Sequence, residues 1–242
     1  MTEAIYILDK RLKLRHLPNG FKTSMDSVLL ASACIAKAGD KILDMGCGVG
    51  GAGFCLLRRV KGLNLTGVDI QVEQIDLARE NAAANGFIDN SEFIAADIID
   101  FKREKEFHHI IMNPPYLDGG KHLRSPHPEK ATAMGHEVEM HSLKEWIDAA
   151  HFNLKSNGTL TIIHRADCVD MIIRDMGKRF GAIELIPLWP KTNVDAKRVI
   201  IRAVKDRRSP MVLHRGVTLH DADGGYTIEA NKILKDMEGL LI

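Results

Sequence analysis

The chain has 242 residues, and 33 basic side chains nearly balance 32 acidic ones, so the formal charge of +1 neither requires nor excludes a nucleic-acid partner. No stretch approaches the roughly 20 consecutive apolar residues of a membrane-spanning helix, and the N-terminus lacks the uninterrupted apolar core of a signal peptide. The four cysteines follow neither a metal-binding nor a disulfide spacing, which indicates a reduced, cytoplasmic protein without a membrane segment.

Short apolar strands alternate with helical patterns along the chain. The sequence predicts strands at 41–45, 63–69, 91–97, 107–113 and 158–164, and helices at 51–60, 71–86, 142–154 and 167–181. Two β-rich runs, 183–190 and 198–205, follow without a helix between them and should pair as an antiparallel hairpin. This order predicts an α/β fold with a seven-stranded, mostly parallel sheet, helices on both faces, and a C-terminal antiparallel hairpin.

The whole chain, residues 1–242, is expected to form a single domain. Residues 1–38 precede the first predicted strand of the sheet, and a short helix is expected near the C-terminus. Residues 117–141 form an insert rich in Pro, Gly, His and Lys that interrupts the alternation of strands and helices. Long irregular inserts in compact α/β domains are usually functional or disordered, and we expect this one on the substrate side.

A glycine-rich loop, DMGCGVGG (44–51), follows the first predicted strand. It fits the G-x-G-x-x-G pattern of dinucleotide-binding folds, and Asp44, Gly46, Gly48 and Gly50 also fit D-x-G-x-G-x-G. The charge of the ligand separates the two readings. The carboxylate of Asp44 would repel a pyrophosphate, whereas it favours the ammonium and sulfonium groups of S-adenosylmethionine. The loop is therefore predicted to bind this methyl donor.

Acidic residues end the next two predicted strands, and each is followed by an isoleucine. Asp69 can accept hydrogen bonds from ribose hydroxyls, and Asp97 can accept one from the adenine amine while Ile98 flanks the ring. The carboxyl ends of parallel strands meet at one edge of a sheet, where ligands of such folds bind. The residues predicted from this pattern to bind the cofactor are Asp44, Gly46, Cys47, Gly48, Gly50, Asp69, Ile70, Asp97, Ile98 and Asn113.

The fourth predicted strand ends in Asn113-Pro114-Pro115-Tyr116. This tetrad resembles the [NDS]-PP-[YFW] motif of the amino-methyltransferases, which act on planar nitrogens. The resemblance implies that the side-chain oxygen of Asn113 and the carbonyl of Pro114 accept the two N–H groups of an amine, so that its lone pair points at the methyl group. The prolines stiffen the backbone around these acceptors, and Tyr116 is expected to stack on the flat substrate.

A wider resemblance covers nearly the whole chain. The segments FKTSMDSVLLASA (21–33), LDMGCGVG (43–50) and MNPPYLDGG (112–120), together with the compact C-terminal hairpin, are similar to the bacterial tRNA1(Val) adenine N6-methyltransferases. The resemblance implies a Rossmann-like class I methyltransferase fold, S-adenosylmethionine as cofactor and a tRNA adenine beside the anticodon as substrate. It also implies that Lys22, Ser24 and Asp26 border the cofactor.

Basic residues follow the tetrad and are predicted to contact the phosphates of an RNA substrate. Within the insert they are accompanied by histidines, and a second group lies further along the chain. The complete set is Lys121, His122, Arg124, His127, Lys130, Arg165, Lys191, Lys197 and Arg198. The histidines lack a recognised metal-ligand spacing and methyl transfer requires no metal, so none is expected.

Three alternatives remain open from the sequence. The same tetrad serves methylation of other planar nitrogens, in ribosomal RNA, DNA adenine or protein glutamine. A nicotinamide-dependent oxidoreductase would use the glycine loop differently, and it would bind a nicotinamide cofactor but no S-adenosylmethionine. A non-catalytic module would bind RNA without methyl transfer.

Overall fold

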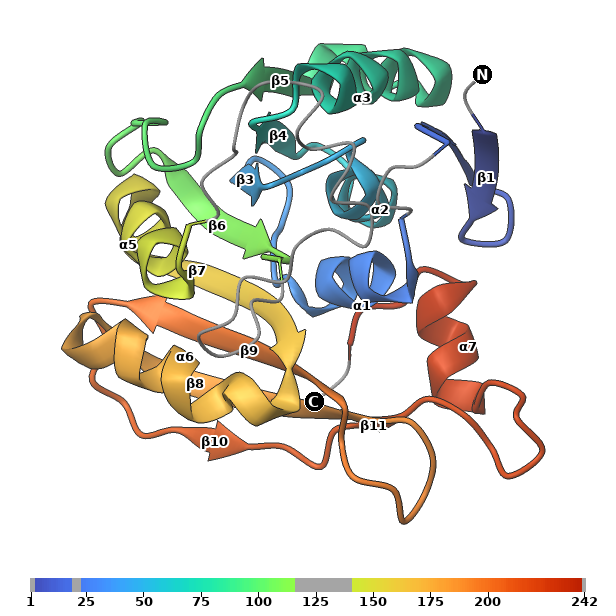
Figure 1. Cartoon of the computed structure of the whole chain (residues 1–242), viewed down its shortest axis with the longest axis vertical. Helices are drawn as coiled ribbons and strands as arrows, with labels where there is room; N and C mark the ends of the chain where they lie inside the picture. The colour runs from blue at the N-terminus through green and yellow to red at the C-terminus, as the bar shows by residue number, and fades with distance from the viewer. Residues whose placement is uncertain (1–2, 19–22, 116–140, 241–242) are drawn as a thin grey trace, which may run out of the picture.

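The computed structural model describes residues 3–18, 23–115 and 141–240, and these form a central sheet with helices on both faces (Figure 1). The sheet order is β10-β8-β9-β7-β6-β3-β4-β5, with β11 also paired to β8. In that order the bounds are Val212–Leu213, Phe180–Trp189, Arg198–Lys205, Leu154–Arg165, Phe107–Met112, Lys41–Met45, Asn64–Asp69 and Ser91–Ala95, and β11 is Val217–Thr218.

The predicted seven strands are all present in this sheet. Strands β5, β4, β3, β6 and β7 run parallel, while β9 is antiparallel to both β7 and β8, as predicted for the hairpin. Two very short strands, β10 and β11, pair with β8 and were not predicted. The sheet therefore has nine strands among the described residues, and the Rossmann-like α/β architecture is confirmed.

The predicted helices are present in the expected order, and α1 (Met25–Ala33) is a further helix that the sequence did not predict. Their bounds are α1 Met25–Ala33, α2 Gly51–Arg59, α3 Val72–Asn85, α5 Leu143–Asn153, α6 Val169–Met176 and α7 Ile228–Leu234, with three short 3-10 turns at Ile88–Asn90, Ala166–Cys168 and Gly177–Arg179. A capping box begins α5, because the Ser142 hydroxyl accepts from the N–H of Glu145 and the Glu145 carboxylate accepts from the N–H of Ser142. No described helix is long and apolar enough to cross a membrane.

Two hydrophobic cores lie on opposite faces of the sheet because neighbouring strand residues point in opposite directions. Ile42 and Ile111 pack with α1, α2, α3 and α7, whereas Leu43 and Ile110 pack with α5 and α6. Every one of these four side chains is fully buried. Burial on both faces explains why these strands read as continuous apolar runs rather than alternating ones.

An N-terminal hairpin, β1 (Glu3–Ile7) with β2 (Leu12–His16), forms a separate two-stranded sheet that the sequence did not predict. Two asparagines of α3 hold it. The Asn81 amide bonds the backbone N–H and C=O of Arg15 at 2.8 and 3.2 Å, and the Asn85 amide bonds those of Lys13 at 3.1 and 2.8 Å. The helix side chains thus satisfy the free edge of β2 as a further strand would.

Candidate functional site

The sheet register brings the amide tetrad beside the glycine loop. Met45 of β3 pairs with Met112 of β6, so Gly46 and Asn113, the residues that follow, leave neighbouring strands at the same edge. Asn113 is partly exposed, Pro114 is buried and Pro115 is exposed. The remaining member of the tetrad, Tyr116, lies outside the described residues. The edge thus carries the two predicted motifs on adjacent strands.

The glycine loop turns sharply away from β3 and depends on glycine at two positions in particular. Gly46 has φ +68°, and a Cβ there would lie 2.6 Å from the Trp146 ring of α5. Gly50 has φ +89°, and a Cβ there would lie 2.3 Å from the Phe54 ring. Both positions need a left-handed backbone that only glycine adopts without strain, and both lack room for a side chain. Over Gly48, in contrast, a Cβ would meet nothing within 4 Å.

Asp69 ties the loop to the end of β4. Its Oδ2 accepts the N–H of Gly48 at 2.9 Å and its Oδ1 accepts the N–H of Gln71 at 2.9 Å. Burial raises the pKa of the Asp69 carboxyl, although these backbone N–H groups oppose the shift. Each carboxylate oxygen keeps a second acceptor position, so the residue can hold the loop and still accept from a ribose.

Asp44 lies behind the loop rather than on its surface. The side chain is 3% exposed, and its Oδ2 accepts the N–H of Gly53 in the first turn of α2 at 2.9 Å. Burial raises the pKa of Asp44 to about 7, and the neighbouring charge of Asp69 adds to the shift, against the hydrogen bond from Gly53. Asp44 therefore fastens the helix to the strand, and any effect on a bound cation acts through space.

Asp97 follows β5, two residues past Ala95, which pairs with Asp69. Its Oδ1 accepts the N–H of Ile99 at 2.9 Å, and its Oδ2 lies 2.7 Å from Nε2 of His141. Partial burial opposes ionisation of Asp97, but these two partners outweigh it and hold its pKa below the usual value. Nothing in the sequence spacing of His141 pointed to a contact with Asp97.

The other predicted cofactor residues differ in accessibility. Ile70 is 43% exposed beside Asp69, whereas Cys47 and Ile98 are buried in the two cores. Burial raises the pKa of the Cys47 thiol well above its usual value, so the thiol stays neutral. Ser24 is exposed at the N-cap of α1. Ile70 therefore presents an apolar surface to a ligand, whereas Ile98 has little exposed surface with which to flank a ring.

Asp26 of α1 forms an ion pair with Arg198, which was predicted to contact the substrate. Its Oδ2 lies 3.2 Å from Nε of Arg198 at the start of β9. In the backbone register of β7 and β9, Arg198 lies opposite Arg165, the last residue of β7. The Nε of Arg165 also donates to Asp167 at 3.0 Å. The predicted cofactor border and the predicted phosphate contacts thus converge on one edge.

Several predicted residues fall outside the part of the chain that the structure describes. They are Lys22, Tyr116, Lys121, His122, Arg124, His127 and Lys130. Among the described residues, Lys197 is exposed and directly precedes Arg198 at the same edge.

The described residues fit S-adenosylmethionine. Open space lies over Gly48, acceptors follow β4 and β5, and an exposed apolar side chain, Ile70, lies between them. Asp69 would hold the ribose, Asp97 the adenine amine, and the backbone of the glycine loop the remainder. The reacting end would then face Asn113 on the neighbouring strand. These assignments remain predictions.

Comparisons with known proteins agree with this arrangement. Residues 13–126 match the family model for the methyltransferase small domain. The chain is 28% identical over 64% of its length to the tRNA1(Val) (adenine(37)-N6)-methyltransferase of Vibrio campbellii, of which it covers 63%. It is 25% identical to the enzyme of that name from Glaesserella parasuis over 91% of both chains. The predicted resemblance is therefore confirmed.

A solved structure supports the fold over most of the chain. The chain resembles a predicted O-methyltransferase from Agrobacterium tumefaciens with a TM-score of 0.71, at 25% identity, covering 86% of this chain and 94% of the other. The class I fold predicted from the sequence is thereby confirmed.

Proposed function

We propose that this chain, an S-adenosylmethionine-dependent methyltransferase, transfers a methyl group to N6 of an adenine in tRNA, next to the anticodon. The observation that carries the proposal is the adjacency of Asn113 and Gly46, which follow the paired Met112 and Met45. This register leaves an amide acceptor on the strand next to the cofactor loop, where an acceptor for an exocyclic amine is needed.

Methyl transfer requires the protein mainly to position the substrate amine against the methyl group. When bound, S-adenosylmethionine supplies a methyl group on a sulfonium: the S–C bond breaks as the N–C bond forms, the sulfur leaves as a neutral thioether, and the amine loses one proton to water. The lone pair of an adenine amine is delocalised into the ring, so the amine is a poor nucleophile. Asn113 Oδ1 and the Pro114 carbonyl would accept its two N–H groups and direct the lone pair along the line of transfer. Acceptors fixed in advance need no reorganisation during the reaction.

A tRNA substrate is supported by the relatives and by the charge at the edge. The curated enzymes from Vibrio campbellii and Glaesserella parasuis are named for adenine 37 of tRNA1(Val). On this chain Arg165, Lys197 and Arg198 lie past Asn113 along the same edge, where they can contact phosphates.

The test is incubation of the protein with labelled S-adenosylmethionine and tRNA from a strain that lacks the modification, followed by nucleoside analysis. Label in N6-methyladenosine supports the proposal. Label in another nucleoside of the tRNA would overturn the assignment to N6 of adenine, and absence of label from every nucleoside would refute methylation of this tRNA.

A further inference from the structure

A polar hollow of about 670 Å³ lies beyond the end of β8, and Lys191 is the one residue of its lining for which a role was predicted above. The turn that joins β8 to β9 forms one wall, and the chain around β11 forms the other. The side chains that matter for its chemistry are Trp189, Lys191, Asn193, Asp195, Arg215 and Thr218. Its volume falls within the range of pockets that hold small ligands or single nucleotides.

The hollow has a fixed aromatic wall. The indole Nε1 of Trp189 donates to the carbonyl of Arg215 at 3.0 Å, and Trp189 pairs with Thr218 in the β8–β11 register. Gly216 has φ +77°, and a Cβ there would lie 2.8 Å from Nε1 of Trp189 and 2.1 Å from the Pro187 carbonyl. The backbone therefore packs directly against the indole and holds the half-buried ring in one orientation.

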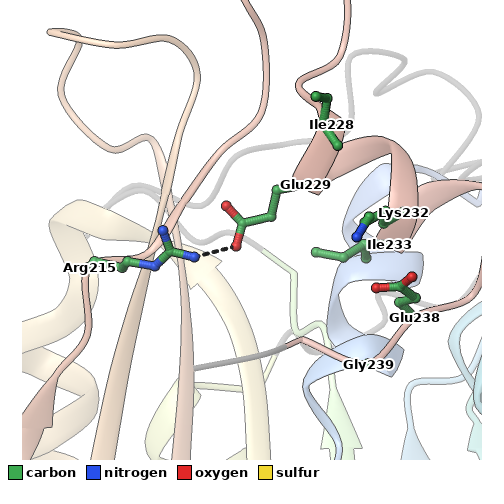
Figure 2. Close-up of a pocket in the computed structure, with 7 residues that line it drawn as sticks. All are labelled: Arg215, Ile228, Glu229, Lys232, Ile233, Glu238 and Gly239. Atoms are coloured by element: carbon green, nitrogen blue, oxygen red, sulfur yellow. Dashed lines mark hydrogen bonds and ion pairs between the residues drawn. The ribbon is translucent and has the colours of Figure 1, made fainter.

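Two basic side chains, Lys191 and Arg215, and two acidic ones, Asp195 and Glu229, line the hollow. Arg215 pairs with Glu229 of α7 at 2.9 Å, and Figure 2 shows this pair beside a second hollow lined by Ile228 and Ile233. The pair offsets the carboxylate of Glu229. Lys191 is exposed on the facing wall, where its Nζ donates to the Ala222 carbonyl at 3.3 Å. The hollow thus joins a cation and an aromatic face with polar acceptors.

The hollow lies in line with the candidate site. β8 runs parallel to β6 because both β7 and β8 are antiparallel to β9, so Trp189 and Asn113 leave the same edge of the sheet. Figure 1 shows the turn after β8 and the loop before α7 extending past that edge. Three strand spacings separate β6 from β8, or about 14 Å, the length of about four stacked nucleotides. Arg165 and Arg198 lie on the strands between.

We propose that this hollow binds one nucleotide of single-stranded RNA, a few positions from the methylated adenine. The base stacks on Trp189, Lys191 contacts the neighbouring phosphate, and Asp195 accepts from the ribose 2′-hydroxyl or a base amine. Aromatic stacking of unpaired bases combined with a cation for the backbone is the usual basis of single-strand recognition. The inference rests on the proposed function and adds a second contact point for the same RNA.

The test compares Lys191→Ala/Asn193→Gly with Lys61→Ala, which removes one exposed cation from the turn between α2 and β4. Glycine at 193 suits the left-handed backbone there, at φ +63°. With an anticodon stem–loop oligoribonucleotide as substrate, the double variant should raise KM about tenfold, because it removes the phosphate contact of Lys191 and the polar side chain of Asn193 beside the stacked base. Its kcat and its affinity for S-adenosylmethionine should match those of Lys61→Ala.

Intrinsic fluorescence gives a direct readout, since the chain has only two tryptophans and Trp146 is buried against the glycine loop. The oligoribonucleotide should quench the emission of the unaltered protein more than that of Trp189→Phe. If the protein methylates the stem–loop but the double variant keeps the KM of Lys61→Ala and the quenching is the same, this inference is wrong and the proposed function stands. If no RNA is methylated, both fail.

Discussion

His141 and Asp97 lie 2.7 Å apart, Nε2 to Oδ2, at the edge of the sheet where the adenine of the cofactor is expected. The second carboxylate oxygen of Asp97 accepts the N–H of Ile99. The carboxylate is thus held from both ends before any ligand arrives. A group fixed in this way binds a ligand without paying the entropy of its own ordering.

Replacing His141 with Ala should weaken the binding of S-adenosylmethionine by about three- to tenfold, since one partly exposed charge-assisted hydrogen bond is lost. His141→Gln keeps a donor and should retain most of the affinity. Isothermal titration calorimetry measures both. Equal affinity for all three proteins would show that the pair does not prepare Asp97 for the ligand.

Asp69→Ala should reduce cofactor affinity more than any other single change at the edge, by about a hundredfold, because it removes the ribose acceptor and also frees the N–H of Gly48. S-adenosylmethionine should then raise the melting temperature little at concentrations that stabilise the unaltered protein. Asp76→Ala, a change to an exposed carboxylate of α3, is the control. A normal ligand-induced shift in Asp69→Ala would place the ribose elsewhere.

The raised pKa of Asp44, about 7, predicts a pH dependence of cofactor binding. The carboxyl is protonated below this value, and the positive charges of S-adenosylmethionine favour its ionised form, so binding should release a proton. Affinity should therefore rise from about pH 5.5 to about pH 7, below the range in which the amino group of the ligand itself titrates.

Asp44→Asn should flatten this rise, and 5′-methylthioadenosine, which carries neither charge, should bind with little pH dependence. The raised pKa of Asp44 also affects the pH dependence of the unfolding free energy. Because the folded pKa is raised, the cofactor-free protein should lose unfolding free energy as pH rises from about 4 towards 7, and Asp44→Asn should not. A pH-independent affinity of the unaltered protein over this range would contradict the assignment.

Much of the fold could be predicted because burial on both faces of a parallel sheet leaves an unmistakable order of apolar runs and helices. The strand ends also located Asp69, Asp97 and Asn113 at one edge. The N-terminal hairpin was missed because its free edge is satisfied by Asn81 and Asn85, two side chains of a helix far along the chain. Contacts between residues so far apart in the chain leave no recognisable pattern in the sequence around either residue.

The sequence predicted which acceptor side chains form the candidate site, but it did not predict which residues hold those acceptors in place. Asp44 looked like a ligand-facing carboxylate, yet its side chain caps the start of α2 at Gly53. His141 and Trp146 reach the site only through the position of α5 on the sheet. Sequence spacing reports which residues end strands, whereas the neighbours that orient them depend on how helices pack.

The basic residues predict a salt dependence of tRNA binding. Each phosphate contact adds about 0.7 to 0.9 to the slope of log affinity against log salt. A Lys121/Arg124/Lys130→Ala variant should therefore bind tRNA more weakly and with a shallower slope, and Lys197→Ala should show a smaller change in the same direction. Both should keep their affinity for S-adenosylmethionine. A slope identical to that of the unaltered protein would remove the altered residues from the RNA surface.

Asn113 gives the sharpest separation of chemistry from binding. It follows Met112 at the end of β6, beside Gly46, and its amide oxygen is the predicted acceptor for the substrate amine. Asn113→Ala should leave the dissociation constant of S-adenosylmethionine within about threefold, while single-turnover methyl transfer to tRNA falls by about a hundredfold or more, the usual cost of losing one preorganised contact.

Two controls make the result specific. Asn113→Asp keeps an acceptor and conforms to the [NDS]-PP-[YFW] pattern, so it should retain more activity than Asn113→Ala. Ser91→Ala, at the opposite end of β5, should change neither rate nor affinity beyond any loss of stability. Near-normal transfer by Asn113→Ala at saturating cofactor and tRNA would mean that the amine is oriented by other groups. Because the alanine variant still binds the cofactor, its failure could not be ascribed to an empty site.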